Sequence, residues 1–395
     1  MKEQMKIITS ANSERLKLVK RAVSAGLGLA ALACAANAGQ PTVLYTMDNS
    51  AMANHVLVIT GTAGSMSVTK TYATGGMGLG SAQGLPSQGS VLLSPDGQWL
   101  FVCNAGSDDI SVFQTLPGGQ LQLTDRVGSG GSYPLSLTLN GSLLYVLNAG
   151  GYVGGSDNIT AFHFGCGNLT MLPGSSQTVG EGAIAGKTGP AQVSFGRDGD
   201  TLVVTERGLT APTSMMIDTW IVDHSGMATD HQVFTSGVGG NFGFAVGRGN
   251  RLFVSEAAGG MSDASALSSY ALSDSGDLTV IDSSVSTKQT AACWVALTFD
   301  GRYVYTANAG SASLSGFGVQ PNGNLKLLNS SGIIVTTGAH PADMAFGHAG
   351  NALFSLNNGD GSLSAFTVGS DGSLVPETGL SAGSLPTTAA GLAAW

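Results

Sequence analysis

Two glutamates occupy the same position in a pattern that recurs along this sequence. In each copy a turn residue is followed, eight positions later, by the last residue of a short apolar strand, and Glu206 and Glu256 hold this last position in two successive copies. Residues 39–395 contain only two other glutamates, Glu181 and Glu377. Two neighbouring carboxylates could supply a general base with a raised pKa, or could bind a divalent cation. Alternatively, Glu or Asn at this position simply caps the turn after the strand.

Arg207 directly follows the first of these glutamates. A guanidinium at this place could polarise a substrate carbonyl and stabilise the negative charge that develops on its oxygen. It could equally form an ion pair at the surface, where such pairs contribute little. Both interpretations of Arg207 stay open from the sequence alone.

Four residues share a second spacing, fourteen positions before the last residue of such a strand: Gln192, Phe242, Trp294 and Asp343. This common spacing predicts that they lie at the same end of the structure as the glutamates. The two aromatic rings could stack on a ring-shaped ligand, while Gln192 and Asp343 orient its polar groups. The alternative for the aromatic rings is packing in the core.

Of the six histidines, His340 is the one expected at this end, directly before Pro341. None of the six has the spacing of a metal-binding motif such as HxxxH. The sequence therefore predicts no histidine metal site, and it does not firmly imply any cofactor. A divalent cation held by Glu206 and Glu256 remains a hypothesis.

The elements that must position these residues are repeats. The segments SPDGQWLFVCNAGSDDISVF from Ser94 and FDGRYVYTANAGSASLSGF from Phe299 are copies of one unit. Six copies keep the same distance between the turn residue and the strand end: Asp96 to Asn104, Asn140 to Asn148, Asp198 to Glu206, Arg248 to Glu256, Asp300 to Asn308, and Ala349 to Asn357. A seventh copy ends at Asp48, and the copies recur about every 51 residues.

Each unit predicts four short strands: a small apolar strand, the repeated strand, a third strand such as LSGF, and an outer strand after a Gly-x-Leu turn. Units of four strands repeated around an axis are typical of β-propeller blades. We therefore predict an all-β, seven-bladed propeller of four-stranded antiparallel blades, formed by residues 39–395 as a single domain. The C-terminal PTTAAGLAAW resembles a first strand without its successors. Residues near 389–395 should thus pair with the N-terminal blade and close the ring.

The N-terminus has the pattern of a secretory signal peptide: basic residues up to Arg21, a short apolar stretch, and Ala36-Asn37-Ala38. Cleavage near Ala38 would place the protein in the periplasm or outside the cell. The remaining chain has 10 basic and 23 acidic residues, a net charge of −13 where the full chain has −9. Such a chain repels phosphate backbones, so nucleic-acid binding is not expected. No later apolar run is long enough for a transmembrane span.

The repeated pattern P-x-x-v-x-f-x-x-D-G-x-x-l-y-v-x-N-a-g-s, with G-x-L before the outer strand, resembles the lactonase-type seven-bladed propellers over residues 43–395. That family includes the propeller 6-phosphogluconolactonases and the carboxymuconate cyclases. The resemblance implies hydrolysis or formation of a lactone ring.

The sequence departs from this family at one dipeptide. First strands of the phosphogluconolactonase type commonly begin with Pro-His, but in this chain the comparable dipeptides are Pro134-Leu135, Pro190-Ala191 and Pro341-Ala342. The sequence also shows no arginine cluster suited to a sugar phosphate. Both observations argue against 6-phosphogluconolactone as the substrate.

Two functional hypotheses follow. In the first, a lactone hydrolase or cyclase, Glu206 or Glu256 activates water or moves a proton, and Arg207 or a bound cation stabilises the oxyanion. In the second, a non-catalytic propeller binds a ligand or a protein partner through the loops on one face of the ring, with a small-molecule ligand expected at the mouth of the central tunnel. The missing Pro-His dipeptides favour the second hypothesis, and the two glutamates at one repeat position favour the first.

Overall fold

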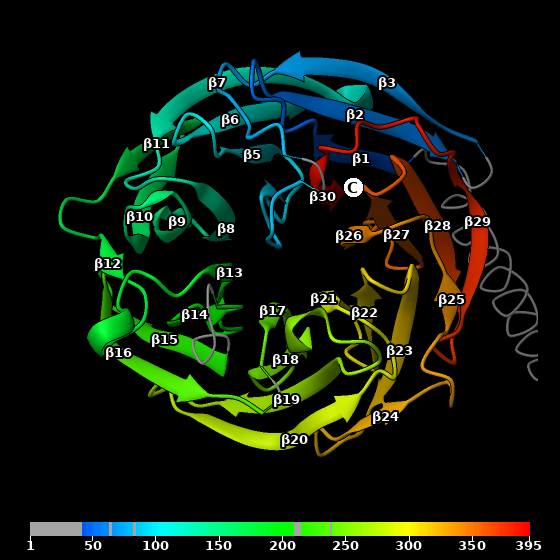
Figure 1. Cartoon of the computed structure of the whole chain (residues 1–395). Helices are drawn as coiled ribbons and strands as arrows, with labels where there is room; N and C mark the ends of the chain where they lie inside the picture. The colour runs from blue at the N-terminus through cyan, green and yellow to red at the C-terminus, as the bar shows by residue number, and fades with distance from the viewer. Residues whose placement is uncertain (1–41, 63–64, 82–83, 209–214, 238) are drawn as a thin grey trace, which may run out of the picture. The chain divides into compact units, whose positions relative to one another are not determined.

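The computed structural model describes residues 42–62, 65–81, 84–208, 215–237 and 239–395. The signal peptide predicted for residues 1–38 lies outside them. The described part of residues 42–395 forms one compact unit in which seven antiparallel sheets surround a central axis (Figure 1). The seven-bladed propeller predicted from the repeats is therefore confirmed.

All seven blades have the same strand order from the axis outward. The first strands, nearest the axis, are in blades 1 to 7 β30 (Ala390–Ala394), β4 (Val91–Leu93), β8 (Pro134–Asn140), β13 (Pro190–Phe195), β17 (Asn241–Gly247), β21 (Ala292–Leu297) and β26 (Pro341–Phe346). The second strands are, in the same order, β1 (Thr42–Met47), β5 (Trp99–Asn104), β9 (Leu143–Ala149), β14 (Thr201–Glu206), β18 (Arg251–Glu256), β22 (Tyr303–Asn308) and β27 (Ala352–Asn357).

The third and fourth strands lie progressively further from the axis. The third strands are β2 (His55–Thr62), β6 (Asp109–Leu116), β10 (Asp157–Gly165), β15 (Met216–Val222), β19 (Ala266–Leu272), β23 (Ser313–Val319) and β28 (Ser362–Val368). The fourth strands are β3 (Ser65–Ala73), β7 (Gln120–Gly128), β11 (Asn168–Met171), β16 (Ala228–Thr235), β20 (Leu278–Ser286), β24 (Leu325–Leu327) and β29 (Leu374–Leu380). Short additions are β12 (Gln177–Thr178), β25 (Val335–Thr336) and the 3₁₀ turns η1 (Pro117–Gly119), η2 (Gly150–Val153), η3 (Gly182–Ile184) and η5 (Ala258–Gly260).

The second strands are almost wholly buried because neighbouring blades cover both of their faces. In β5 (WLFVCN) and β22 (YVYTAN) every residue after the first is buried. The fourth strand β3 (SMSVTKTYA) is mostly exposed. A strand buried on both faces reads as a continuous apolar run, which is why the second strands carry the strongest repeat signal in the sequence.

The Asp-Gly turns of the repeat set where each second strand begins. In blade 2, Asp96 Oδ1 accepts a hydrogen bond from Ser94 Oγ at 2.5 Å, and Gly97 adopts a φ of 69°. In blade 6, Asp300 Oδ1 likewise accepts from Thr298 Oγ1 at 2.7 Å. Because these turns are alike, the second strands of the blades that contain such a turn end at the same level along the propeller axis, eight residues after the turn residue.

The ring closes between the two ends of the propeller. Tyr45 of β1 pairs with Ala393 of β30, and the backbones of Val43 and Trp395 exchange hydrogen bonds at 2.8 and 3.1 Å. The C-terminal strand thus occupies the first position of blade 1. This confirms the predicted closure by residues near 389–395.

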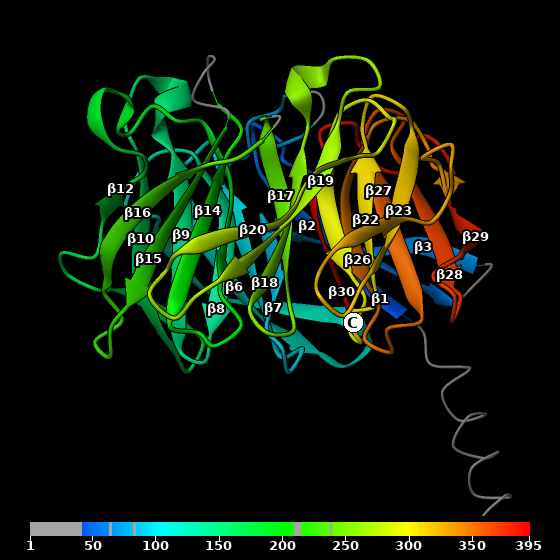
Figure 2. The same ribbon diagram turned by 90° about the horizontal axis from the view of Figure 1, so that it is seen from below.

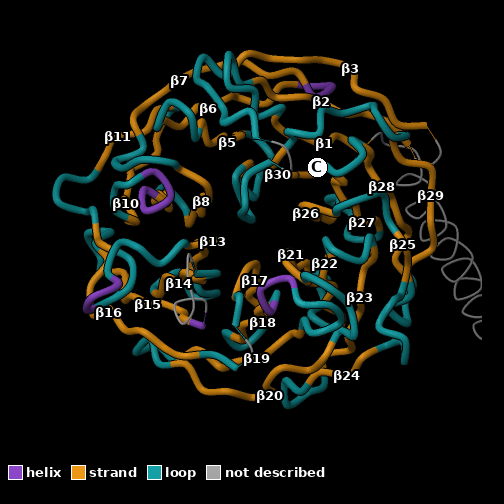
Figure 3. Tube along the Cα trace, in the orientation of Figure 1, coloured by secondary structure: helices purple, strands orange, loops and turns teal. Residues whose placement is uncertain are grey.

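A segment between blades 1 and 2, residues 84–90, reaches into the centre of the ring, where Figures 1 and 3 show a connection between the first strands. We call this segment the plug. The Gln88 side chain donates to Val295 O at 2.8 Å and accepts from Val295 N at 2.9 Å, both in blade 6. Its backbone N–H donates to Ala191 O at 3.2 Å in blade 4, and its carbonyl accepts from Ser136 Oγ at 2.7 Å in blade 3. The plug therefore ties together blades that are not neighbours in the ring.

Candidate functional site

The second strands all end on one face of the propeller, which we call the loop face because the connections to the third strands lie there (Figure 2). The predicted ring of strand ends is Asp48, Asn104, Asn148, Glu206, Glu256, Asn308 and Asn357. All of these except Asp48 have no exposed surface. The repeat position is therefore an internal one in blades 2 to 7.

Side chains at this position bond to the third strand of their own blade. Asn104 Nδ2 donates to Ser111 Oγ at 2.8 Å, and blades 6 and 7 repeat this Asn–Ser contact. Glu256 Oε1 accepts from Ser268 Oγ at 2.9 Å. The position thus fastens the second strand to the third beneath the connecting loop. The Glu206 and Glu256 carboxyl groups accordingly lie inside blades 4 and 5.

Blade 4 departs from the pattern because Glu206 faces a second carboxyl group. Asp218 of β15 lies next to it, and both side chains are fully buried. Asp218 Oδ1 lies 2.5 Å from His231 Nε2 and accepts from Gly180 N at 2.9 Å. Burial, and next the Asp218 carboxylate, raise the pKa of Glu206 far above its usual range. This shift favours the protonated form of the Glu206 carboxyl group.

Arg207 lies half-buried at the loop face, next to aromatic side chains. Its Nε donates to the Tyr152 hydroxyl at 2.6 Å, and its Cζ lies 5.2 Å from the Tyr152 ring centroid and 5.9 Å from that of Phe242. Among the described residues, no carboxylate lies within ion-pair distance of the guanidinium. Aromatic faces hold a cation without neutralising it. Arg207 is thus arranged to receive a negative charge from a ligand.

The aromatic contacts continue from Arg207 around the tunnel mouth. Phe242 and Trp294 meet edge to face with ring centroids 4.9 Å apart, and Trp294 meets His340 at 6.4 Å. On the other side, Tyr152 contacts Tyr133 at 5.5 Å. We call this set the aromatic row: Tyr133, Tyr152, Arg207, Phe242, Trp294 and His340. It spans blades 3 to 7 and brings together four of the residues singled out in the sequence.

Trp294 is fixed by the plug, since its Nε1 donates to Ser87 O at 2.8 Å. Only 3% of Trp294 and 4% of Phe242 is exposed, so both rings also pack in the core. The preceding residue, Cys293, is buried, and burial raises the pKa of its thiol to about 12. A thiol in this state is not a nucleophile at neutral pH.

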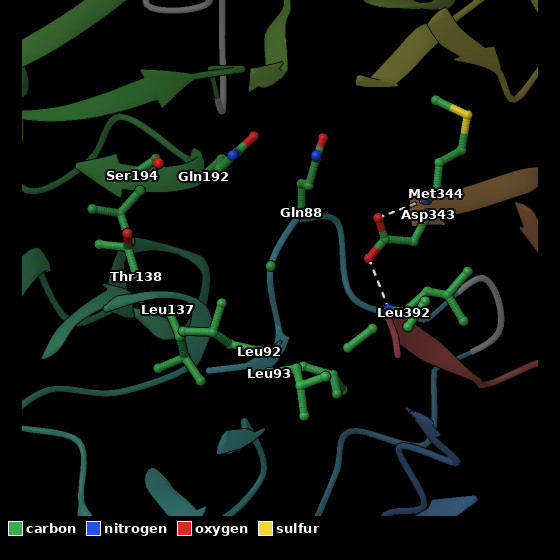
Figure 4. A pocket seen from close by; sticks show the side chains of 15 residues that line it. Gln88, Leu92, Leu93, Leu137, Thr138, Gln192, Ser194, Asp343, Met344 and Leu392 are labelled. Atoms are coloured by element: carbon green, nitrogen blue, oxygen red, sulfur yellow. Dashed lines mark hydrogen bonds between the residues drawn. The ribbon is translucent and has the colours of Figure 1, made fainter. Parts of the chain in front are cut away.

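Gln192 and Asp343 line a cavity of about 310 Å³ beside the plug and do not join the aromatic row (Figure 4). The Gln192 amide donates to Phe244 O at 3.1 Å and accepts from Phe244 N at 2.6 Å. Asp343 accepts from Met344 N at 2.8 Å and Leu392 N at 3.0 Å, and burial raises its pKa to about 8. Each side chain therefore hydrogen-bonds to backbone groups on the inner edge of the first strand of the next blade, β17 for Gln192 and β30 for Asp343.

The family model for lactonases with a seven-bladed β-propeller matches residues 36–181 and 210–333. This chain belongs to that lactonase family. A search of curated protein sequences found no match. Among solved structures, the chain is similar to a putative 6-phosphogluconolactonase from Bacteroides fragilis, with a TM-score of 0.65 and 17% identity over 90% of this chain and 98% of that chain.

The periplasmic gluconolactonase of Pseudomonas aeruginosa is another similar structure, with a TM-score of 0.67 and 16% identity over 88% of this chain and 98% of that chain. A protein from Lactobacillus plantarum has a TM-score of 0.67 and 17% identity, over 90% and 100% of the two chains. At these identities the structural likeness shows the fold alone.

The sequence analysis did not single out three residues of the aromatic row and the plug. Tyr152 lies in η2, a connection that differs in length between blades, so no repeat position marks it. Gln88 lies in a segment without a counterpart in other copies. Tyr133 had a usable signal, because it precedes Pro134 just as His340 precedes Pro341.

Within the described ranges, no group of three or more His, Cys, Asp or Glu side chains is arranged to hold a metal ion. In the same part of the chain no helix has the length and apolar character that crossing a membrane requires.

Proposed function

We propose that this protein opens or forms the lactone ring of a small organic acid or sugar acid at its loop face. Membership of the lactonase family supports the reaction class. The observation that carries the proposal is the Arg207 guanidinium, which is held by Tyr152 and Phe242 with no carboxylate of the described residues to neutralise it.

Arg207 supplies the main requirement of lactone chemistry. Attack of water on the lactone carbonyl places negative charge on the carbonyl oxygen, and a preorganised cationic donor stabilises that charge as it develops. The buried rings of Phe242 and Trp294 pack beside Arg207 and help to fix its surroundings. Arg207 is the catalytic residue of this scheme.

The substrate in this proposal carries no phosphate group. Arg207 is the single arginine or lysine of the aromatic row, whereas recognition of a phosphate group commonly uses several cationic donors. A net charge of −13 after removal of residues 1–38 adds repulsion for a multiply charged anion.

Glu206 and Glu256 enter the proposal as positioning residues. Glu206 directly precedes Arg207 at the end of β14 and is buried inside blade 4. Glu256 pairs with Asn241, which directly precedes Phe242. Each glutamate therefore fixes the backbone next to a member of the aromatic row. A divalent cation at these carboxyl groups stays a prediction.

A panel of lactones tests this function. Purified protein lacking residues 1–38 is incubated with sugar-acid, alkyl and aryl lactones and with 6-phosphogluconolactone, with and without a chelator, and acid release is followed at constant pH. We expect turnover of at least one unphosphorylated lactone, unaffected by the chelator. If only the phosphorylated lactone is turned over, the proposed substrate class is refuted. If the chelator abolishes activity, the reaction requires a divalent cation, as the hypothesis for Glu206 and Glu256 states.

We also propose that the protein acts in the periplasm or outside the cell. The pattern of residues 1–38 supports this location. N-terminal sequencing of the protein from cell fractions is expected to give a mature chain starting near Gly39 in the periplasmic or extracellular fraction. An uncleaved chain in the cytoplasm would contradict the proposal.

Protein binding is the second candidate function, because three loops of the loop face expose large apolar side chains. Met52, Val153 and Met261 are 88%, 59% and 61% exposed. Exposed methionines adapt to the surfaces of protein partners. If the lactone panel shows no turnover, a pull-down that is lost when these three residues are changed to Ser would favour this alternative.

A further inference from the structure

The residue directly before the first strand has a left-handed backbone in blades 3 to 7. These residues are Tyr133, Gly189, Gly240, Ala291 and His340, with φ values of 63°, 65°, 72°, 55° and 53°. Glycine adopts this conformation freely, whereas a side chain at Cβ makes it unfavourable. Blades 4 and 5 have glycine at this position, so the fold itself does not need a side chain. Blade 7 nevertheless carries a histidine, His340, whose ring centroid lies 6.4 Å from that of Trp294.

His340 has a partner that fixes its tautomer. Its Nδ1 lies 2.8 Å from Asn358 Oδ1, and Asn358 Nδ2 donates to Ala389 O at 3.2 Å. Because the amide NH₂ group is engaged by a carbonyl, the amide oxygen must be the atom that faces the imidazole. Nδ1 therefore donates a proton to Asn358, and neutral His340 carries its lone pair on Nε2.

The surroundings of this pair leave it little freedom. Asn358 is 1% exposed, and its backbone N–H donates to His340 O at 3.2 Å. A Cβ atom on Gly359 would lie 2.8 Å from the His340 Cβ, and one on Gly84 of the plug would lie 3.0 Å from Asn358 Nδ2. Two glycines thus permit the close packing that holds the imidazole next to Trp294.

We propose that His340 is the general base of the site and that Asn358 is the positioning residue that directs its Nε2 toward the reacting water. This inference rests on the proposed lactone chemistry. A base oriented by a third polar group is the arrangement expected of an activated catalytic histidine.

The proton transfers balance as follows. His340 Nε2 takes a proton from water while the water oxygen bonds to the lactone carbonyl carbon, and the oxyanion forms opposite Arg207. Collapse of this intermediate breaks the bond between the acyl carbon and the ring oxygen. The leaving ring oxygen takes the proton from Nε2, and the new carboxylic acid releases its own proton to solvent.

Three variants separate catalysis from structure. His340→Gly should lower kcat by about 100-fold or more, change KM little, and recover activity with added imidazole. Its melting temperature should stay near that of the wild type, because relief of the left-handed backbone offsets the loss of the hydrogen bond to Asn358. His348→Gln, a histidine of the same blade stacked on Trp395, serves as the control and should keep wild-type activity.

Nitrogen NMR of the imidazole provides a readout that does not depend on lactonase activity. Wild-type His340 should show the Nδ1-protonated neutral tautomer, and Asn358→Leu, the third variant, should lose that preference and lower kcat. If the protein opens lactones but His340→Gly keeps wild-type kcat, or if the wild-type imidazole is Nε2-protonated, this inference is overturned and the role of Arg207 is untouched. If no lactone is turned over while the tautomer is as expected, the proposed function fails instead.

Discussion

Tyr133 and His340 show, at the scale of single residues, how the site differs from its scaffold. Both keep a large side chain at a left-handed position where blades 4 and 5 have glycine. Backbone strain of this kind persists where the side chain is useful. Both side chains belong to the aromatic row, at its two ends.

Tyr152→Phe tests the polar contact of the row. The variant loses the hydroxyl that accepts from Arg207 Nε at 2.6 Å, but it keeps the ring beneath the guanidinium. Loss of one hydrogen bond of about 1 kcal/mol predicts a fall of about five-fold in kcat/KM. Tyr133→Phe is the matched control and should stay within about two-fold of the wild type, the scatter expected of a neutral change. Equal losses in both variants would contradict the assigned contact.

Asp343→Asn tests the buried carboxyl group beside the plug. Burial raises the folded-state pKa to about 8 from the usual 3.8, so the folded protein holds a proton that the unfolded chain has lost. The stability from this proton is full below the unfolded-state pKa and is lost as pH rises toward 8.

The free energy of unfolding of the wild type, relative to Asp343→Asn, should therefore fall by about 2.6 kcal/mol between about pH 5 and pH 7. Urea titrations at the two pH values measure this difference, and the exposed Asp371→Asn serves as the control. A constant difference would show that Asp343 is ionised in the folded protein.

Some residue roles could be predicted from the sequence and others could not. The repeat register located Phe242, Trp294 and Arg207 correctly at one end, because strand ends in a propeller share a face. The register did not show that the Glu206 side chain points into its blade. It determines the position of a residue along its strand, but not which groups its side chain contacts. The Asp218 that faces Glu206 lies on the next strand, in a different local pattern.

The plug is the main feature at the scale of the elements. It joins blades 3, 4 and 6 through Gln88, and it holds Trp294 through Ser87. The Gly-rich sequence around residues 72–89 predicts a loop, but its course into the centre of the ring follows from contacts with strands more than 100 residues away. No local pattern encodes such contacts.

Gly243→Ala should displace the plug. A Cβ atom at this position would lie 2.1 Å from Gln88 Oε1 and 2.8 Å from Cys293 O, so the Gln88 bridge to Val295 must break or shift. Overpacking of this kind costs about 1–3 kcal/mol, and we expect a lower melting temperature together with a changed Trp294 fluorescence. Gly128→Ala, at a position with no atom within 4 Å of the added Cβ, should change neither. A Gly243→Ala protein with wild-type fluorescence and stability would refute the described course of the plug.

At the scale of the whole molecule, the propeller depends on β30 to complete blade 1. Deleting residues 390–395 removes the first strand of that blade together with the buried Ala390, Leu392 and Ala393. We expect the truncated chain to lose its single cooperative unfolding transition. Trp395→Ala, which removes only the ring stacked on His348, should keep that transition. A truncated chain that still unfolds in one step would contradict the closure.

The number of blades and the closure could be predicted because both follow from the repeat period and from an unmatched strand at each end. Substrate and chemistry did not follow in the same way, since the fold is common to many functions. The site combines contributions from five blades, and the contacts between neighbouring members of the aromatic row became evident only in the structure.

The central claim is that Arg207 stabilises the oxyanion of a lactone, and the kcat/KM of Arg207→Gln for an unphosphorylated lactone tests it most directly. Loss of one oxyanion donor predicts a fall in kcat/KM of about 100- to 1,000-fold. Arg207→Lys should recover part of this loss, and Arg302→Gln, at an exposed arginine, should keep the wild-type kcat/KM. A wild-type kcat/KM in Arg207→Gln would contradict this role of Arg207.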